Sequence, residues 1–372
     1  MEIIKGRFAQ AKVFADDMED YARAQLKMIC DDPVSENSRI RVMPDVHPGK
    51  VGTIGLTMTV GKRIMPGLLG IDIGCGMTCA VLKEKRMELQ KLHKIVREYV
   101  PSGFKTRQKA HPMAALFDPE ALCCTGSIHG EKAALSLGTL GGGNHFIEVD
   151  KDGEGGLYLT VHTGSRHLGK EVTDYYMREG ARRLKERGTE VPYPVTWLEG
   201  DLMEDYIADV KTVQEYAQLN REIIITEITK AMKLKVKESF SSVHNYLDTY
   251  EGQRILRKGA ISAGEGEKVI IPVNMRDGII LGTGKGSPEW NGSAPHGSGR
   301  RIKRDEVKNH YTVSSFKNEM KGIYCSCIGA DTLDEAPFAY RPISEILETI
   351  QDTVEVTDIL KPIYNYKAGG KE

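Results

Sequence analysis

Apolar residues recur at spacings of three and four in several parts of the chain, which is the pattern of helices with one buried face. Near the N-terminus, Val13, Met18, Tyr21, Leu26 and Met28 follow this spacing. We therefore expect helices over residues 12–29, 87–99, 171–188, 200–236 and 344–354.

Short apolar runs separated by glycine and proline predict β-strands elsewhere in the chain. LYLTVH (157–162) is the clearest, because apolar residues alternate along it and it contains β-branched side chains. Further strands are predicted at 51–60, 79–82 and 323–328, and as short pieces between glycine turns across 252–300.

The order of these elements predicts how the chain is organised. Strands and loops come first, a helical insertion follows at about 171–251, and strands and loops return after it. Neither internal repeats nor a low-complexity linker divide the sequence. We therefore predict a single α+β domain, 1–372, in which the two glycine-rich parts form one body with helices on its outside.

Composition and charge exclude several classes of protein. Of the 372 residues, 40% are hydrophobic and 28% are charged, which excludes a collagen-like, disordered or coiled-coil protein. No apolar run approaches the length of a membrane span, so no membrane partner is expected. The formal net charge is -1, and any nucleic-acid site must therefore be a local basic patch.

The cysteines and the N-terminus predict the compartment. Neither a disulfide framework nor a zinc ribbon fits the seven cysteines, which form no C-x-x-C pair. The N-terminal segment MEIIKGRFAQAKVFADDMED lacks the apolar core of a signal peptide. We expect a cytoplasmic protein in a reducing environment.

Asp72 and Cys75 lie three residues apart in GIDIGCGM (70–77), on a segment bent by glycines. A carboxylate and a thiolate at this spacing can face one cation; thiolate with imidazole suits zinc, manganese, iron or cobalt, and the carboxylate favours manganese. The alternative interpretation is a small buried cysteine in a tight turn, and this motif alone leaves both open. Cys79 lies in an apolar run and is expected in the core.

Histidines supply the other candidate ligands. A solitary histidine is more often a surface or core residue than a ligand, but loops and strand ends carry function more often than other positions do. Five of the ten histidines lie in glycine turns or at strand ends, namely His47, His145, His162, His244 and His296.

Two of these histidines have amide neighbours. GTLGGGNHFIE (138–148) places Asn144, His145 and Glu148 within five residues, a combination that can hold and orient a metal ligand. The glycines give it the composition of a phosphate loop, although the Walker lysine is absent. In the second case, Asn245 follows His244.

His296 lies among small residues in GSAPHGSGRRIKR (292–304), just before a basic run. Its small neighbours leave the imidazole accessible, and guanidinium groups bind phosphates bidentately. His296 is therefore a candidate phosphoryl or nucleotidyl acceptor. The same pattern also fits a solvated basic helix start.

Taken together and in order, these motifs resemble the RtcB family of RNA ligases. The resemblance extends from about residue 43 to residue 370 and implies an RtcB-like α+β fold, with mixed or antiparallel sheets around a central metal cleft. The matching strings are MPDVHPGK (43–50), GIDIGCGM (70–77), LGTLGGGNHFIEV (137–149), VHTGSR (161–166), HNY (244–246), RKGA (257–260), IIP (270–272) with Met275, HGSGR (296–300) and YKAGG (366–370).

The resemblance implies a GTP- and Mn²⁺-dependent ligase that joins an RNA 3′-phosphate or 2′,3′-cyclic phosphate to a 5′-hydroxyl. His296 matches the histidine that is guanylylated in the family. Cys75 would bridge two Mn²⁺ ions, one held also by Asp72 and His145, the other by His162 and His244. These are assignments by resemblance.

Further residues match or lie near family positions that bind nucleotide or RNA. The implied nucleotide-binding set is Asn144, Glu148, Asn245, Asn274, Glu289, Arg300 and Lys367, and Lys367 is expected to contact the guanine edge with help from Glu289. The implied RNA-binding set is Asp45, Lys50 and Arg166. The implied partners are GTP and broken or spliced tRNA or rRNA ends.

Two other functions remain compatible with this sequence. One is a paralogue that guanylylates itself and caps nucleic-acid 3′-phosphates with little sealing. The other is a metal-bound RNA-end binding protein without turnover. A GTP-adduct assay separates the binding protein from the two enzymes, and a sealing assay separates the enzymes from each other.

Overall fold

The computed structural model of the chain describes residues 1–367. Residues 368–370 of the matched string YKAGG, and the end of the predicted domain 1–372, lie outside the described residues.

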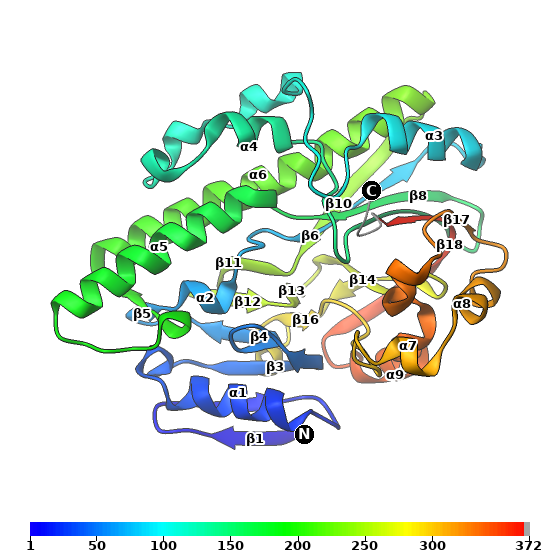
Figure 1. Ribbon diagram of the computed structural model, residues 1–372. Helices are drawn as coiled ribbons and strands as arrows, with labels where there is room; N and C mark the ends of the chain where they lie inside the picture. Colours follow the sequence, from blue (N-terminus) through cyan, green and yellow to red (C-terminus); the bar gives the residue numbers. More distant parts are fainter. Residues whose placement is uncertain (368–372) are drawn as a thin grey trace.

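Two large, mainly antiparallel sheets form the body of the molecule (Figure 1). The first has the order β1 (Glu2–Lys5), β2 (Gln10–Val13), β3 (Ile40–Pro48), β4 (Thr53–Thr59), β12 (Gln253–Lys258), β11 (Asn245–Tyr250). The second has the order β10 (Val236–Val243), β6 (Gly76–Leu82), β8 (Leu157–Thr163), β7 (Phe146–Lys151), β18 (Val354–Lys367), β15 (Gly278–Gly284), β14 (Lys268–Asn274), with β17 (Tyr324–Cys325) beside β18.

The remaining strands form two short ribbons, β13 (Ala260–Ser262) with β16 (Ser293–Pro295) and β5 (Arg63–Ile64) with β9 (Leu198–Glu199). Most strand pairs are antiparallel, and β2–β3 and β17–β18 are parallel. This mixture of helices with mixed and antiparallel sheets confirms the predicted α+β fold class.

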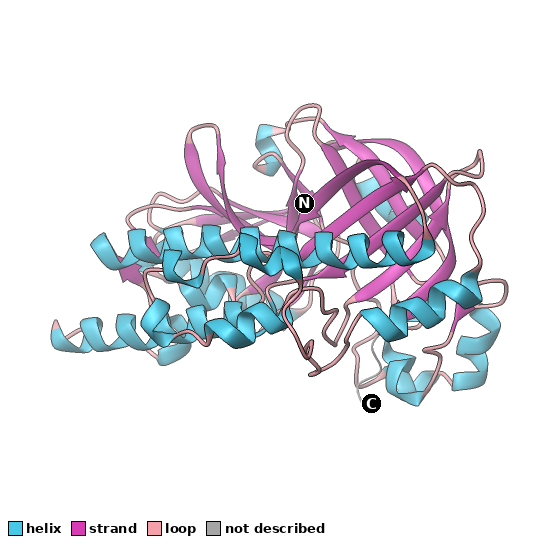
Figure 2. Cartoon of the chain, turned by 90° about the horizontal axis from the view of Figure 1, so that it is seen from above, coloured by secondary structure: helices cyan, strands magenta, loops and turns pink. Residues whose placement is uncertain are grey.

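Long helices form a layer against the sheets (Figure 2). The longest is α6 (Gly200–Met232), which packs beside α5 (Arg166–Glu186) and across β6 and β8. Its apolar residues enter two cores, Val210 and Val213 in one and Ile224 and Ile228 in the other. The other helices are α1 (Asp20–Asp31), α2 (Pro66–Leu69), α3 (Leu89–Tyr99), α4 (Gly130–Ser136), α7 (Val307–His310), α8 (Val313–Glu319) and α9 (Ile343–Thr349).

The predicted elements are confirmed in type at most positions, with three corrections. The helix predicted at 12–29 begins only at Asp20, because residues up to Val13 form β2. The predicted insertion at 171–251 is not helical throughout: α6 ends at Met232, and β10 and β11 follow. The helix predicted at 344–354 ends at Thr349.

The longest strand, β18, was not predicted. It contains Pro362, and a proline argues against a central strand because it cannot donate to the ladder. The structure accommodates it where the register with β7 shifts between Pro362 and Tyr364. The bulge leaves Ile363 unpaired and disrupts the ladder beside Pro362, which pairs with Asp150, so the missing N–H is tolerated there.

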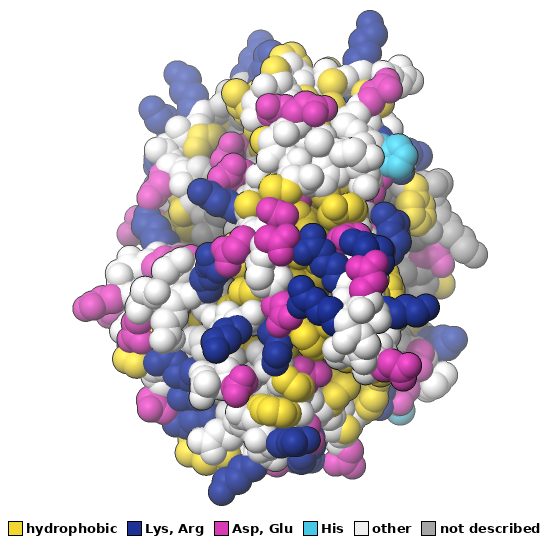
Figure 3. Space-filling view, turned by 90° about the vertical axis from the view of Figure 1, so that its left-hand side faces the viewer, with side chains coloured by type: hydrophobic (Ala, Val, Ile, Leu, Met, Phe, Trp, Pro, Cys, Tyr) yellow, Lys and Arg dark blue, Asp and Glu magenta, His cyan; other side chains and the backbone are white. Residues whose placement is uncertain are grey.

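The end of the molecule where α5 stops and α6 starts mixes both charge signs (Figure 3). Arg183 pairs with Asp201, and Arg187 pairs with Glu199. Such pairs partly neutralise the basic side chains of this face. Within residues 1–367, no helix has both the length and the apolar character needed to cross a bilayer.

Candidate metal centre and active site

Four neighbouring strands of the second sheet bring the metal-ligand candidates together at one end of these strands. In an antiparallel sheet, the start of one strand lies beside the end of its neighbour. Gly76 at the start of β6 pairs with Thr163 at the end of β8 and with Val243 at the end of β10. Phe146 at the start of β7 pairs with His162. The adjoining residues Cys75, His145 and His244 therefore meet His162 although they are distant in sequence.

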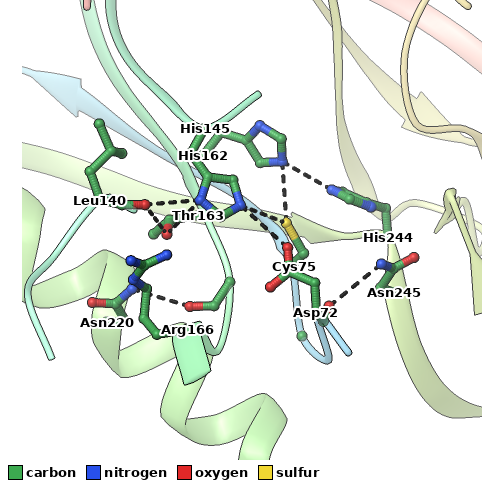
Figure 4. Close-up of polar contacts among 12 residues, drawn as sticks. Asp72, Cys75, Leu140, His145, His162, Thr163, Arg166, Asn220, His244 and Asn245 are labelled. Carbon is green, nitrogen blue, oxygen red and sulfur yellow. Dashed lines mark hydrogen bonds and ion pairs between the residues drawn. The ribbon is translucent and has the colours of Figure 1, made fainter. Parts of the chain in front are cut away.

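The side chains converge through their metal-binding atoms (Figure 4). The Sγ atom of Cys75 lies 3.4 Å from Nε2 of His162 and 3.5 Å from Nε2 of His145. Nε2 of His162 lies 3.0 Å from Nε2 of His244, and Nε2 of His145 lies 3.3 Å from Oδ2 of Asp72. The five residues form two overlapping groups, each with its ligand atoms within 4.8 Å of one another, and Cys75 belongs to both.

The donor set fits metal ions. Nδ1 of His145 donates to the carbonyl of Leu140 at 2.9 Å, which leaves the Nε2 lone pair free to face Asp72 and Cys75. Nδ1 of His162 and Nδ1 of His244 are buried without a hydrogen-bond partner in the described part of the chain. Three imidazoles that converge on a thiol, with few other partners, are a ligand arrangement that a cation would satisfy.

The protonation states of these side chains also suit metal ligands. Burial, together with charge on neighbouring histidines, holds the pKa values of His162 and His244 well below their ordinary range, so both rings are neutral. Burial alone would raise the pKa of Asp72, but the hydrogen bond and charge of His145 lower it to about 2. Burial and the charge of Asp72 raise the pKa of the Cys75 thiol. A metal must therefore displace the proton of Cys75 to use its thiolate.

Two residues of α6, which the sequence analysis did not single out, hold the metal loops in place. Arg221 is fully buried and donates to the carbonyls of Gly74, at 2.8 Å, and Thr163, at 2.9 Å. Asn220 accepts from the N–H of Gly138 at 2.7 Å and donates to the carbonyl of Gly164 at 3.2 Å. Both lie on the buried face of the helix. In the sequence they occupy positions where the helical spacing predicts apolar residues, and polar residues at such positions indicate buried hydrogen bonds.

We expect Arg221→Met to lower the free energy of unfolding by about 3 kcal/mol, because it leaves two buried carbonyls without donors. Lys211→Met, an exposed cation on the same helix, is the matched control and should change it by less than about 0.5 kcal/mol. Urea unfolding measures both. Equal stability of the Arg221→Met protein and the parent would show that the hydrogen bonds of Arg221 to Gly74 and Thr163 do not stabilise the fold.

His296 lies next to the metal cluster, directly after β16. Its ring centroid is 4.9 Å from that of His244. Nδ1 of His296 lies 2.7 Å from Oδ2 of Asp45, whose side chain is only 2% exposed. Gly299 permits this approach, because it has a φ of +70° and a Cβ there would lie 3.2 Å from Cα of Asp45. Asp45, which the resemblance expects to bind RNA, thus contacts the Nδ1 side of the candidate nucleophile His296.

Two cavities meet at His296. The larger has a volume of about 1740 Å³ and is lined by residues that include Lys12, Arg301 and Lys303. The smaller, of about 130 Å³, is lined by residues that include Glu148, Asn274 and Lys367. His296, Asn144, His244 and Arg300 line both.

The small cavity has a charged wall. Glu148 is buried, and Asn365 donates a hydrogen bond to it. Burial raises the pKa of Glu148 to about 7, and burial together with the charge of Glu148 raises the pKa of the neighbouring, fully buried Asp150 well above its ordinary range. Asp150 therefore keeps its proton and Glu148 is the better acceptor. Lys367 is also buried; burial opposes its charge, but Glu335 raises the pKa of Lys367 above its usual range.

Lys367 and Glu289, which the resemblance expects to contact the same guanine, line different cavities. Lys367 pairs with Glu335. Glu289 is 65% exposed, pairs with Lys12 and lines the large cavity, whereas the small one is lined by Lys367. Glu335 reaches Lys367 because the chain runs from β17, which pairs with β18, into the short helix that ends at Glu335.

Other predicted nucleotide and RNA contacts are engaged within the protein. Asn245 accepts from the N–H of Gly259 at 3.0 Å and lies 3.5 Å from the carbonyl of Asp72, so it braces the metal loop. Asn274 caps the turn after β14 by accepting from the N–H groups of Arg276 and Asp277.

The predicted RNA contacts Lys50 and Arg166 are not among the residues that line the two cavities. Lys50 is exposed and lines neither of them in the described part of the chain. Arg166 has a left-handed φ of +57° and donates to the hydroxyl of Thr139, at 3.2 Å, and to the carbonyl of Gly103, at 2.9 Å. Its guanidinium therefore holds two loops beside the metal cluster.

Comparisons with known proteins identify the family of the chain. The family model described as tRNA-splicing ligase RtcB matches residues 25–368. The RNA-splicing ligase RtcB of Escherichia coli K12 is 28% identical over 87% of this chain and 88% of its own length. The tRNA-splicing ligase RtcB of Nanoarchaeum equitans is 25% identical over 84% of each chain. The chain therefore belongs to the RtcB family of tRNA-splicing ligases.

Proposed function

We propose that the protein is a GTP-dependent RNA ligase that joins RNA 3′-phosphate or 2′,3′-cyclic phosphate ends to 5′-hydroxyl ends, with a GMP adduct on His296. The observation that carries the proposal is the position of His296, between the metal-ligand cluster and the charged small cavity, with Asp45 on its Nδ1. Family membership supports an RNA substrate. The unpaired state of the seven cysteines supports a cytoplasmic location.

Two Mn²⁺ ions would suit the donor set: Asp72, Cys75 and His145 would hold one, and Cys75, His162 and His244 would hold the other. When bound, such ions neutralise phosphate charge and favour in-line attack at phosphorus.

Asp45 sets the tautomer of the nucleophile. Its Oδ2 atom lies 2.7 Å from Nδ1 of His296, and a carboxylate this close favours a proton on Nδ1, which leaves the lone pair on Nε2. Nε2 attacks the α-phosphorus of GTP; the new P–N bond replaces the bond to the β-phosphate, and pyrophosphate leaves. Asp45 stabilises the positive charge that develops on the ring. Asp45 is thus a positioning residue.

The RNA steps follow from the adduct. An oxygen of the RNA 3′-phosphate attacks the phosphorus on His296, the P–N bond breaks, and RNA-ppG forms. The 5′-hydroxyl then attacks the RNA-side phosphorus of the anhydride, and GMP leaves with the bridging oxygen. The junction phosphate therefore comes from the 3′ end. A cyclic phosphate must first be hydrolysed to the 3′-phosphate.

The small cavity suits a guanine base. Glu148 supplies a carboxylate for the N–H donors of guanine, and Lys367 supplies a donor for its carbonyl oxygen. A buried site that hydrogen-bonds a base edge rejects other bases, because they leave its polar groups unpaired.

We expect Lys367→Ala to reduce GMP labelling by about 10- to 100-fold, as for loss of a hydrogen bond from a charged donor. Binding of Mn²⁺ should be unchanged, since Lys367 is not among the metal-ligand candidates. Labelling with [α-³²P]GTP and calorimetric titration of Mn²⁺ measure the two effects. Labelling by ATP as efficient as by GTP would contradict base selection.

The large cavity is the proposed RNA site. Several of its basic residues form ion pairs with carboxylates, Arg301 with Glu345, Lys303 with Glu19 and Arg304 with Asp334. RNA phosphates must compete with these carboxylates, so we expect RNA binding to weaken as salt is raised.

Sealing of a defined RNA tests the proposal. With Mn²⁺ and GTP, a 3′-phosphate or cyclic-phosphate end should join to a 5′-hydroxyl, and nuclease digestion should trace the junction phosphate to the 3′ fragment. RNA with 3′-hydroxyl and 5′-phosphate ends should remain unjoined. Joining of only these opposite ends would overturn the proposal, and accumulation of RNA-ppG without joining would instead indicate a capping paralogue.

A further inference from the structure

Two cysteines beside the small cavity take no part in the proposed reaction. Cys325 ends β17, and Cys327 follows two residues later; their Sγ atoms lie 3.1 Å apart. Both side chains are half-buried, and Ser326 between them is exposed. The sulfur of a disulfide partner lies at about 2.05 Å, so the two atoms need to approach by only about 1 Å to bond.

The two thiols are not equivalent. A hydrogen bond joins them, and it raises the pKa of Cys325 and lowers that of Cys327. The backbone N–H and the charge of Lys367 lower the pKa of Cys327 further, against the effect of burial. Cys327 is therefore the more easily deprotonated thiol of the pair and Cys325 the proton donor in their hydrogen bond, the division of roles found in reactive dithiols.

The other cysteines differ from Cys327 in this respect. Burial raises the pKa of each of Cys30, Cys75, Cys79, Cys123 and Cys124. A thiol with a raised pKa is a poor nucleophile at neutral pH. Cys327 is thus the one cysteine of the described chain whose pKa is lowered.

The cysteine pair is connected to both partners of the Lys367–Glu335 ion pair. Cys325 pairs with Asn365 in β18, the strand that ends at Lys367. The hydroxyl of Thr332 donates to the carbonyl of Cys327, and the short helix that contains Thr332 ends at Glu335. Tightening of the turn at 325–327 therefore acts on the backbone on both sides of this ion pair.

We propose that Cys325 and Cys327 are a redox modification site, in which a reversible disulfide weakens nucleotide binding in the small cavity. The oxidation of the two cysteines is independent of the proposed function, whereas the effect on nucleotide binding rests on the proposed function. The reaction partner is a low-molecular-weight disulfide. The Cys327 thiolate attacks one of its sulfurs and releases one thiolate; the Cys325 thiol, losing its proton, then attacks the Cys327 sulfur and releases the second thiol.

Glutathione disulfide is the probe for the oxidation of the two cysteines. Treatment of the full-length protein with bound Mn²⁺ should give an internal 325–327 disulfide in peptide mapping by mass spectrometry, after alkylation of the remaining thiols. Cys325→Ser should stop the reaction at a glutathione adduct on Cys327. The proposal fails if no internal disulfide forms in the parent protein, or if the Cys325→Ser protein carries its adduct elsewhere.

Labelling with GTP tests the effect on the cavity. The oxidised parent should lose about tenfold in initial labelling rate at subsaturating GTP, as for one weakened charged hydrogen bond, and dithiothreitol should restore it. The Cys325→Ser/Cys327→Ser protein retains Cys75 and should label at the parent's rate with or without glutathione disulfide. Equal inactivation of this variant would place the effect elsewhere and overturn the coupling.

The outcomes separate the two proposals. A 325–327 disulfide without any change in labelling overturns the coupling to the cavity. Absence of labelling in the fully reduced parent overturns the proposed function instead, while the peptide map still decides whether the dithiol is oxidised.

Discussion

Replacement of His296 by alanine is expected to abolish covalent attachment of GMP, a loss to background and therefore the largest effect that we predict. No other described histidine combines a carboxylate at 2.7 Å from its Nδ1 with a place at the junction of the two cavities. The parent protein, incubated with [α-³²P]GTP and Mn²⁺, should carry label that is acid-labile and alkali-stable, as a phosphoramidate is. Electrophoresis of the protein after acid or alkali treatment measures this.

Two variants sharpen the test. His310→Ala removes an exposed histidine of α7 and should label as the parent does. Asp45→Asn keeps an acceptor near Nδ1 of His296 but removes the charge, and it should slow labelling by about 10²-fold. Equal labelling of the His296→Ala protein would refute the assignment of His296 as the nucleophile. A parental labelling rate of the Asp45→Asn protein would show that Asp45 does not position His296.

Replacement of Cys75 by alanine is expected to weaken the binding of both Mn²⁺ ions. Cys75 belongs to both ligand groups, whereas Asp72 belongs to one. Loss of a hydrogen-bonding partner behind a ligand typically costs 10- to 100-fold in metal affinity, so loss of the shared ligand should cost at least about 10²-fold. Asp72→Ala should weaken one ion more than the other. Calorimetric titration with Mn²⁺ resolves the two ions.

The pH dependence identifies the thiol. Because burial and Asp72 raise the pKa of Cys75, Mn²⁺ must displace its proton, and affinity should rise by about tenfold per pH unit near neutrality. His162 and His244 add no slope there, because their lowered pKa values leave them neutral. The slope should vanish in Cys75→Ala and persist in Cys79→Ala, its matched buried control. Two ions bound at parental affinity by Cys75→Ala would disprove the shared ligand.

The elements of the fold followed from local patterns in the sequence, and the exceptions have local causes. Alternation in LYLTVH predicted β8, and helical spacing predicted α3 and α6. The start of α1 was misplaced because residues before Asp20 share its apolar character. Strand β18 escaped prediction because Pro362 has no N–H for a ladder, and only the bulge opposite β7 makes it acceptable.

The sequence by itself determined the chemical groups of the candidate site: a thiol, a carboxylate and imidazoles, each on a glycine turn or at a strand end. It could not determine that Arg221 clamps the metal loop, because the carbonyls it binds belong to Gly74 and Thr163, far away along the chain. Its position among the apolar residues of α6 was the available signal.

Only the tertiary structure decided which side chains meet. Lys367 lies with Glu335 and not with Glu289, and Asp45 lies behind His296 and not toward the solvent. The physical reason is that residue type and spacing are local properties, whereas these contacts depend on which strands are neighbours. The order β10–β6–β8–β7 brings Cys75, His162 and His244 together, and the pairing of β17 with β18 brings Glu335 to Lys367.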